Sequence, residues 1–306
     1  KYTFVVKLTI FTATYNRAHL LPRLFKSLKR QGCFDFEWLV IDDGSVDKTT
    51  DLFEDFLKEE LPFSIRFYTQ ENQGLIRTLN SGISLAKGCY LIKMDSDDYV
   101  MDDFVENICR WIDEIDSNKK IYAVGGLRVT AQGMPLKGKW PIIPKEGYVD
   151  ASDIERKQYN LDADMTEAWR LEVLRRYPFP VWPTEKFAPE QIVTHQIAIE
   201  GYKIRWRAVP LTICEYQEGG LTLGASTLEK KNPMGYAMMY EQQLDRPDFS
   251  FQKKICSAMN MFALTMIGRT PSYYFKNKHK VIKLLAFIPG VLLFFRRIKQ
   301  FVSNGG

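Results

Sequence analysis

The sequence predicts an α/β fold, in which a mainly parallel sheet is flanked by helices and followed by a helical region. Short apolar runs alternate with longer amphipathic segments through residue 130, which is the pattern of successive βαβ units. Polar motifs follow directly after these runs, as expected where the strands of a parallel sheet end at a ligand site. Beyond Ser226 the strand pattern is lost and helical periodicity takes over.

The first 130 residues contain apolar runs that suit strands buried on both faces of a sheet. The expected strands are Lys7–Thr12, Phe36–Ile41, Ser64–Thr69, Cys89–Met94 and Ile121–Thr130. Between them, apolar residues recur every three or four positions, which predicts helices. The expected helices include Leu20–Leu28, Leu52–Leu57, Leu75–Ala86 and Asp103–Ser117. This order predicts right-handed crossovers and one common edge for the polar loops.

The middle of the chain, residues 131–189, is rich in tryptophan and proline and has only short periodic pieces such as Met165–Arg176. Loops of this kind tend to carry recognition rather than scaffold. After it, we expect a helix over Glu190–Glu200 and strands over Tyr202–Ala208 and Leu211–Tyr216.

The composition is that of an ordinary globular protein, because 45% of the 306 residues are apolar and 26% are charged. This excludes an intrinsically disordered chain. The five cysteines lack the paired spacing of a zinc site or a disulfide framework, which favours a reducing compartment. No signal peptide is visible, and no nucleic-acid partner is expected.

The net charge of +5 conceals an uneven distribution. Through Asp248 the chain carries 32 Lys and Arg against 37 Asp and Glu, whereas residues 249–306 carry 10 Lys and Arg and no acid. Within this tail, Leu284–Phe295 is uncharged and has basic residues on both sides. It is shorter than the about 20 residues that span a bilayer, and Pro289-Gly290 would kink it. We therefore expect an interfacial segment held to anionic lipid; the alternative is a buried helix at a dimer interface.

Three acids follow the fourth expected strand, in the stretch GCYLIKMDSDDYV at residues 88–100. Asp95 and Asp97 are separated by one residue in a tight turn, so their oxygens can share a divalent cation that also binds phosphates. The functional interpretation is a Mg²⁺ or Mn²⁺ site for a diphosphate. The alternative is a solvated acidic turn that caps the helix beginning near Asp103.

Two further polar motifs follow expected strands. Asn16 and Arg17, after the first strand, can donate hydrogen bonds to a base or phosphate, and DDGS at residues 42–45 can accept them from a nucleobase or ribose. Alternatively, the first is an ordinary loop and the second a helix N-cap with a turn. Each motif is weak by itself, but together they form the order TxTYNR, DDGS, NQG and DSDD.

This order resembles the family-2 glycosyltransferases, which are inverting nucleotide-sugar enzymes with a GT-A fold. The resemblance is carried by TATYNR at 12–17, WLVIDDGS at 38–45, NQGLIRTLNSG at 72–82 and LIKMDSDD at 91–98, and it covers roughly residues 7–220. It implies a glycosyltransferase domain over 1–225, divided into a nucleotide-sugar half at 1–130 and an acceptor half at 131–225. A helical region with a membrane-associating segment would follow at 226–306.

The resemblance also assigns roles to individual residues. Tyr15 and Asp43 would contact the base, supported by Asp42. Asp95 would meet the ribose, and Asp97, with Asp95, would hold a divalent metal, Mn²⁺ or Mg²⁺. The full set implied for the nucleotide sugar is Thr14, Tyr15, Asn16, Arg17, Asp42, Asp43, Asn72, Gly74, Arg77, Asn80, Asp95 and Ser96.

An inverting transfer needs a carboxylate that accepts the proton of the attacking hydroxyl. Family members carry it in a late acidic motif at the start of a helix, and the match here is KFAPEQIVTHQIAIEGYKIRW. Glu190 is the implied base, with Gln191 where the family often has Asp; the alternative is a first-turn residue favoured by the helix dipole. Trp182 and Glu185 would shape an acceptor pocket, or else only pack the loop.

A second departure is in the NQG stretch, where the family has basic residues near the diphosphate. This chain has Leu75 and Leu79 instead, which leaves Arg77 as the substitute.

The expected reaction is transfer of a sugar from a nucleoside diphosphate, expected to be UDP, to a glycan or lipid-linked glycan. The expected place is the cytoplasmic face of the cell membrane, with peripheral attachment through the tail.

Two other functions remain open. A sugar-phosphate nucleotidyltransferase also uses a Rossmann-like sheet and a metal, but such enzymes carry a glycine-rich N-terminal loop, and ATYNRA at residues 13–18 contains no glycine. A non-catalytic membrane scaffold with a decayed transferase domain is disfavoured because the acids at 43, 95, 97 and 190 are intact.

Overall fold

The computed structural model describes residues 6–136, 139–215, 225–276 and 278–303. They form two compact units. The first comprises the described residues of 1–178 and 200–217, and the second those of 179–199 and 218–306. The second unit therefore includes the segment Phe179–Ile199 in addition to the C-terminal region predicted at 226–306.

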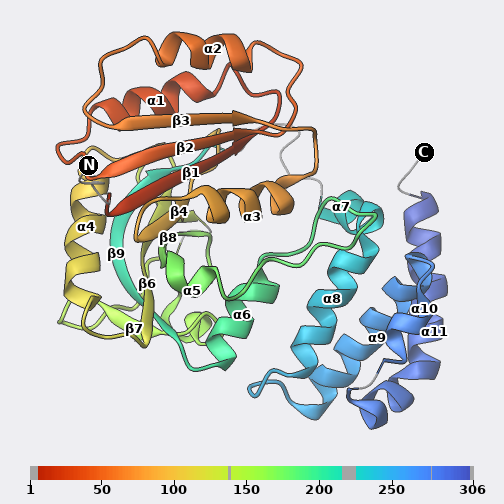
Figure 1. Ribbon diagram of the computed structural model, residues 1–306. Coiled ribbons are helices and arrows are strands. Elements are labelled where there is room, and N and C mark those ends of the chain that lie inside the picture. Colours follow the sequence, from red (N-terminus) through yellow and green to blue (C-terminus); the bar gives the residue numbers. More distant parts are fainter. Residues whose placement is uncertain (1–5, 137–138, 216–224, 277, 304–306) are drawn as a thin grey trace. The chain divides into compact units, whose positions relative to one another are not determined.

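The first unit is built on an open sheet, shown in Figure 1. Its strands are β1 (Leu8–Thr14), β2 (Phe36–Asp42), β3 (Ser64–Thr69), β4 (Tyr90–Lys93), β5 (Tyr99–Val100), β6 (Ile121–Val129), β7 (Val149–Ala151), β8 (Met165–Arg170) and β9 (Lys203–Ile213). The order is β3-β2-β1-β4-β8-β6-β9-β5, with β7 beside β9. Strands β3, β2, β1 and β4 are parallel, whereas β8, β5 and β7 are antiparallel to their neighbours, so the sheet as a whole is mixed.

Helices cover both faces of the parallel half. They are α1 (Leu21–Lys29), α2 (Thr49–Phe56), α3 (Leu75–Leu85) and α4 (Phe104–Ile115), with the short α5 (Leu171–Leu174) and a 3₁₀ turn at Arg156–Tyr159 farther along the chain. In Figure 1, α1 and α2 lie above β1–β3 and α3 lies below them. The alternation of a strand explains this: Leu8 and Ile10 pack in the core formed with α1, α2 and α4, while the ring of Phe11 lies against Gly82 of α3.

The later strands differ from expectation in two places. Strand β8 lies in the region predicted to be irregular. The predicted pair Tyr202–Ala208 and Leu211–Tyr216 is one strand, β9, and Tyr216 lies outside the described residues. Pro210 does not end β9, because the pairing of β9 with β6 shifts register around Leu127 and tolerates a residue without an N–H.

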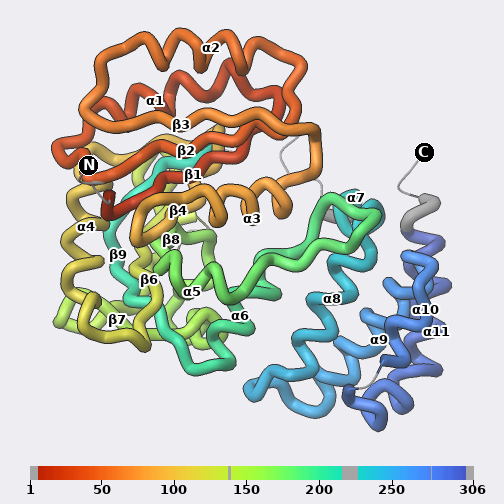
Figure 2. The backbone as a smooth tube through the Cα atoms, viewed as in Figure 1, coloured from red at the N-terminus to blue at the C-terminus, as the bar shows by residue number. Residues whose placement is uncertain are grey.

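The second unit is helical. Its helices are α6 (Gln191–Ile199), α7 (Ala225–Lys231), α8 (Pro233–Leu244), α9 (Phe251–Ile267), α10 (Pro271–Tyr274) and α11 (Lys280–Ser303). Helix α9 packs against α8, α10 and α11, as the backbone path in Figure 2 shows. None of the helices in the described part of the chain is both long and apolar enough to cross a membrane.

Helix α11 continues through Pro289, where a kink was predicted. The next residue, Gly290, lies so close to α9 that a Cβ would be 3.0 Å from the ring of Phe262. The missing side chain therefore allows α11 to pack tightly on α9. This contact holds the helix along the face that carries Ala286 and Gly290, both of which are buried.

Two adjacent glycines set the contact between β6 and β9. A Cβ on Gly125 would lie 2.6 Å from the ring of Trp206, and one on Gly126 would lie 2.5 Å from Leu211. Both neighbours are fully buried, so neither can move aside easily. The glycine pair thus fixes how β6 approaches β9.

We predict that Gly125→Ala destabilises the protein by about 1–3 kcal/mol, because the added methyl group overpacks against the indole of Trp206. Gly32→Ala is the matched control, since no atom lies within 4 Å of its added Cβ. Urea unfolding of both variants measures the difference. Equal stability of the two variants would show that β6 and β9 can separate freely.

Candidate functional site

Four polar loops meet at one edge of the parallel strands. The register pairs Thr14 of β1 with Asp42 of β2, and Asp42 with Thr69 of β3, so these strands end side by side. β4 lies on the other side of β1 and ends at Lys93, which pairs with Phe11. The loops after β1, β2, β3 and β4 therefore begin at the same edge, as the sequence predicted for a βαβ sheet.

The carboxylate of Asp43 ties the second loop to the third. Its Oδ1 accepts hydrogen bonds from Gln70 Nε2 at 2.7 Å and from the Gln73 backbone N–H at 2.9 Å, and its Oδ2 accepts one from the Gly74 N–H at 2.8 Å. The carbonyl oxygen of Asp43 accepts a hydrogen bond from Asn72 Nδ2. Asp43 is buried, and three donors of the chain itself satisfy its carboxylate.

The first and second loops are joined in a similar way. Asp42 Oδ1 accepts hydrogen bonds from the backbone and hydroxyl of Ser45, which forms a compact turn after β2. The Asn16 backbone N–H donates to Ser45 Oγ at 2.8 Å, and Asn16 Oδ1 accepts from the Val46 N–H at 2.8 Å. Asn16 has φ 53°, a left-handed conformation that Asn tolerates better than most residues. Gly44 has φ 83°, and a Cβ there would lie 2.9 Å from the Asn72 nitrogen, so only glycine fits.

The acidic turn after β4 is held by two arginines from the first loop and α1. Arg17 Nη1 lies 2.5 Å from Asp97 Oδ2. Arg23 Nη2 donates to the Asp97 carbonyl at 2.6 Å, and its Nη1 lies 2.6 Å from Glu215 Oε2. The guanidinium of Arg23 also covers the ring of Tyr99 at 4.4 Å. The turn is thus fixed at both its side chain and its backbone.

A third arginine compensates the other two acids. Arg128, near the end of β6, places Nη2 3.0 Å from Asp95 Oδ2 and 3.6 Å from Asp98 Oδ2. Burial by itself would raise the pKa of Asp95, but the positive charges of Lys93 and Arg128 outweigh it and lower that pKa to about 2. Asp98 is more deeply buried, and burial together with the charges of Asp95 and Asp97 raises its pKa to about 7 despite Arg128. The turn therefore holds an ionised Asp95 beside an Asp98 that retains a proton up to near neutral pH.

The helix-capping alternatives for the acidic turn and for DDGS do not describe the chain. Helix α4 begins after Asp103, whose side chain makes no cap hydrogen bond, so the Asp95–Asp98 turn is not its cap. Helix α2 begins after Lys48, again without a side-chain cap, and the DDGS stretch lies before that residue. The acids at the strand ends therefore bind each other's loops rather than the helix termini that follow.

The donor set fits a metal that is shared with a ligand. Among the described residues, no group of three or more His, Cys, Asp or Glu side chains is arranged to hold a metal ion. Mg²⁺, however, is usually bound by one or two carboxylates together with phosphate oxygens of a substrate. Asp95 and Asp97, two carboxylates of one turn, fit that mode. Two buried oxygens near the loops, Thr14 Oγ1 and Asp98 Oδ2, also have no hydrogen-bond partner within the described structure.

The remaining predicted residues of the first unit differ in exposure. The side chain of Tyr15 is 49% exposed, whereas Ser96 is buried within the acidic turn. Arg77 and Asn80 lie on α3, where Arg77 Nη1 donates to the Gln73 carbonyl at 3.1 Å. The structure therefore brings the four loops together, with Arg77 beside the third.

Sequence reasoning missed Arg23, Arg128, Lys93 and Cys214. These four residues hold or face the acidic turn, and the thiol of Cys214 hydrogen-bonds Asp98. Arg23, Arg128 and Cys214 lie on other elements and follow no motif, and Lys93 lies in the stretch LIKMDSDD without a recognisable role there, so only the three-dimensional structure identifies the four. The single signal in the sequence is the density of acids, which requires compensation by nearby cations.

The predicted base and acceptor residues belong to the second unit. Glu190 directly precedes α6, and its carbonyl accepts the first hydrogen bonds of that helix, from Val193 and Thr194. Glu185 is buried, and its two oxygens accept hydrogen bonds from the Met234 and Gly235 N–H groups at the start of α8. Its carboxylate therefore binds the N-terminus of α8, where a negative charge is favoured.

Trp182 packs edge-on against Tyr273, with ring centroids 5.3 Å apart. For both Trp182 and Glu185 the structure thus shows the packing role that the sequence left open. An acceptor-binding role for these two residues stays a prediction.

Comparison with known sequences extends this description. The model of "Glycosyl transferase family 2" matches residues 9–162, about half of the chain. Glycosyltransferase GlyA of Streptococcus pneumoniae is 30% identical over 112 residues, which are 37% of this chain and 16% of GlyA. Chondroitin synthase of Escherichia coli is 27% identical over 150 residues, 47% of this chain and 21% of that protein. The chain thus spans less than a quarter of the length of either relative.

Solved structures support the fold. TarS of S. aureus, residues 1–349, in complex with UDP-GlcNAc has a TM-score of 0.64 and 18% identity, covering 95% of this chain and 81% of that one. The mannosyltransferase PcManGT of Pyrobaculum calidifontis, in complex with GDP-Man and Mn²⁺, has a TM-score of 0.52 and 16% identity, covering 96% and 82%. The chain therefore belongs to glycosyl transferase family 2, and its GT-A fold is confirmed.

Proposed function

We propose that this chain transfers a sugar, with inversion, from a nucleoside diphosphate donor to a glycan or lipid-linked glycan acceptor. The observation that carries the proposal is the set of four loops tied together through Asp43 and Asp97 at one edge of the sheet, in a chain of family 2. UDP is the proposed nucleotide, because the similar TarS structures are complexes with UDP and UDP-GlcNAc.

The first two loops suit the nucleoside. The half-exposed ring of Tyr15 is free to stack on a base, as aromatic side chains do. Thr14, which precedes Tyr15, pairs with Asp42, and its carbonyl accepts a hydrogen bond from the Asp43 N–H. Because the loop donors already occupy the Asp43 carboxylate, its proposed role is to hold the third loop in place for the ligand.

The acidic turn suits the diphosphate and its metal. Asp97 and Asp95 are the proposed ligands of Mg²⁺ or Mn²⁺, which would supply positive charge to the leaving diphosphate. Arg17, whose guanidinium lies 2.5 Å from Asp97, is the nearest cation to that carboxylate. Together with Arg77 it is a candidate for direct contact with phosphate oxygens, since the planar guanidinium suits bidentate phosphate binding.

Glu190 is the proposed general base. As the acceptor hydroxyl attacks the anomeric carbon, its proton passes to the Glu190 carboxylate while the bond to the diphosphate breaks on the opposite side. The support for this is the position of Glu190 immediately before α6, where the family motif places a carboxylate.

A membrane-bound acceptor is proposed from the tail. Helix α11 exposes large apolar side chains, and lysines and arginines flank them. Such a helix binds the surface of an anionic bilayer without crossing it. We propose peripheral attachment to the cytoplasmic face of the cell membrane, where lipid-linked glycans would be presented.

A panel of nucleotide sugars tests the reaction itself. The purified chain should release a nucleoside diphosphate from one of them, with Mn²⁺ or Mg²⁺ present. A nucleotidyltransferase would instead release pyrophosphate from a nucleoside triphosphate and a sugar phosphate. A scaffold would release neither product.

We predict that Asp97→Asn abolishes turnover and Mn²⁺-dependent UDP binding, measured by calorimetry, because a neutral amide is a poor ligand for a hard cation. The fold should persist, since asparagine keeps an oxygen that can accept a hydrogen bond from Arg17, and Arg23 still binds the backbone carbonyl of residue 97. Asp103→Asn, an exposed position whose side chain makes no cap hydrogen bond, is the control and should bind UDP normally. Unchanged metal-dependent binding in Asp97→Asn would remove Asp97 from the site.

We predict that Glu190→Gln keeps UDP binding but slows transfer by roughly 10²–10⁴, because the amide cannot accept the proton of the acceptor hydroxyl. Steady-state transfer rates and calorimetric UDP binding provide the two measurements. Near-normal transfer would mean that another carboxylate is the base.

Glu185→Gln is the matched comparison for Glu190→Gln. It removes one of two carboxylate oxygens that bind α8, so it should lower the free energy of unfolding by about 1–3 kcal/mol. At a temperature where the variant is folded, it should keep far more transfer activity than Glu190→Gln, because Glu185 is predicted to shape the acceptor pocket and not to accept the proton. A rate loss as large as that of Glu190→Gln would instead place Glu185 in the chemistry.

A further inference from the structure

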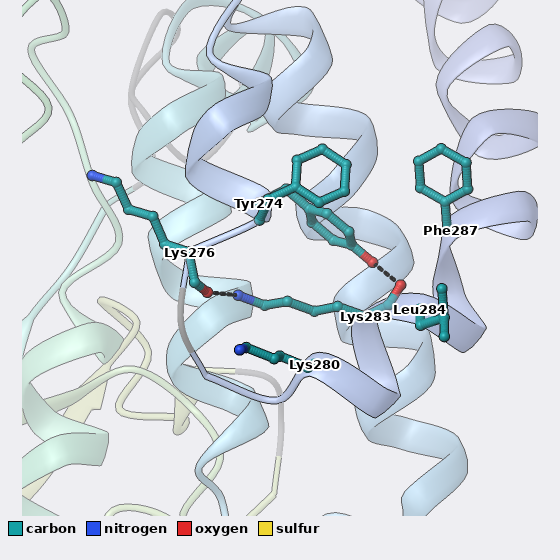
Figure 3. A pocket seen from close by; sticks show the side chains of 7 residues that line it. Tyr274, Lys276, Lys280, Lys283, Leu284 and Phe287 are labelled. Carbon is teal, nitrogen blue, oxygen red and sulfur yellow. Dashed lines mark hydrogen bonds between the residues drawn. The ribbon is translucent and has the colours of Figure 1, made fainter.

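A pocket of about 260 Å³ lies where α10 leads into α11. Its walls combine three lysines, Lys276, Lys280 and Lys283, with the aromatic rings of Tyr274, Phe275 and Phe287 (Figure 3). The volume is below the about 300–1,000 Å³ of ordinary small-molecule pockets, so it suits a phosphate-sized group rather than a whole nucleotide sugar. Leu284 completes the wall on the side of α11.

The pocket has a fixed cationic wall. Lys283 is buried; its Nζ donates to the Lys276 carbonyl at 3.0 Å and lies 3.6 Å from Glu241 Oε1. Its own carbonyl accepts a hydrogen bond from the Tyr274 hydroxyl at 2.6 Å. Figure 3 shows the side chains of Lys280 and Lys283 extending in the same direction. Burial lowers the pKa of Lys283 although Glu241 opposes this, so an added anion would stabilise its charge.

The positive charges of the other two lysines, Lys276 and Lys280, are not neutralised by a neighbouring acid in the described part of the chain. Within the described structure, no carboxylate lies at ion-pair distance from Lys276 or Lys280. The nearby Asp245 is already paired with His279 at 2.9 Å and lies 3.8 Å from Lys278. The pocket therefore has more cationic than anionic groups, which favours an anionic occupant.

An exposed apolar face continues from the pocket along α11. Leu284, Ile288, Leu292 and Phe295 recur every three or four residues and are 76%, 73%, 68% and 58% exposed. The opposite face of the helix, with Ala286 and Gly290, packs on α9. A continuous apolar stripe that is exposed on a surface helix favours an interaction site.

We propose that the pocket binds the phosphate headgroup of a membrane phospholipid while the apolar face of α11 enters the surface of the bilayer. The lysines match the phosphate in charge, and the adjacent stripe matches the acyl chains in polarity. A second copy of this chain fits less well, because two faces rich in lysine and arginine would repel each other. Within the described residues, no carboxylate lies at ion-pair distance from Lys276, Lys280, Arg296 or Lys299. The proposal rests on the membrane association proposed above, but not on the transfer reaction.

Co-sedimentation of the full chain with vesicles tests the proposal. Three compositions are compared at constant ionic strength: phosphatidylcholine alone, phosphatidylcholine with phosphatidic acid, and phosphatidylcholine with oleic acid adjusted to the same surface charge. The pocket should favour the compact phosphate of phosphatidic acid over the carboxylate of oleic acid. Failure to bind any vesicle would refute the membrane association itself, whereas equal binding to the two anionic vesicles would refute only the pocket.

Paired variants separate the pocket from general attraction by the tail. Lys276→Gln with Lys280→Gln should weaken binding to phosphatidic acid vesicles at least about tenfold and remove the preference over oleic acid. Arg296→Gln with Lys299→Gln removes the same charge at the other end of α11 and should keep the preference. If both pairs lower binding equally and both keep the preference, the pocket has no selective role. Circular dichroism and UDP binding, which the pairs should leave unchanged, confirm that the variants fold.

Discussion

The first unit depends on one guanidinium. Strand β4 delivers three aspartates within four residues to a partly buried turn, and Arg128 compensates two of them. Removing one partner of a buried ion pair typically costs about 3–5 kcal/mol, because the remaining charges lose compensation. Arg128 reaches the turn because β6 pairs closely with β9, and that pairing needs Gly125 and Gly126 to admit Trp206 and Leu211. The glycine pair of β6 thus supports the acidic turn that follows β4.

The parallel half of the sheet could be predicted almost residue by residue. Strands β1, β2 and β4 are mostly buried, so their sequences are apolar runs, whereas β3 buries only part of Ile65 and Phe67 against the core. Each loop that follows these four strands carries a polar motif. The strands of the antiparallel half are harder to recognise from the sequence. Strand β8, MTEAWR, contains Glu167 and Arg170, and the buried Arg170 donates to the carbonyls of Ile115 and Ile121. A charged residue that finds its partners on distant elements looks like a loop residue in the sequence, so the strand went unrecognised.

The sequence predicted the residues of the candidate site that lie in motifs, and it missed those that lie outside them. Residues that lie in the loops, such as Asp43 and Asp97, belong to motifs that the sequence displays. Arg23 and Arg128, which hold the acidic turn through the Asp97 carbonyl and through Asp95 and Asp98, come from a helix and a strand with no pattern of their own. Asp43 also shows that a motif residue can position another loop and need not contact the ligand itself. Its carboxylate accepts hydrogen bonds from the third loop, so it shapes the site before any ligand binds.

The tail shows why a choice between a membrane segment and a buried helix cannot be made from composition. An α-helix has two faces, and residues four apart share one of them. Ala286 and Gly290 form the buried face, where the missing side chain of Gly290 brings α11 against Phe262. Leu284 and Ile288 form the exposed face. Pro289 removes one backbone hydrogen bond, yet the helix continues, because packing on α9 stabilises it on both sides of the proline. The same contact that buries one face therefore leaves the other face exposed.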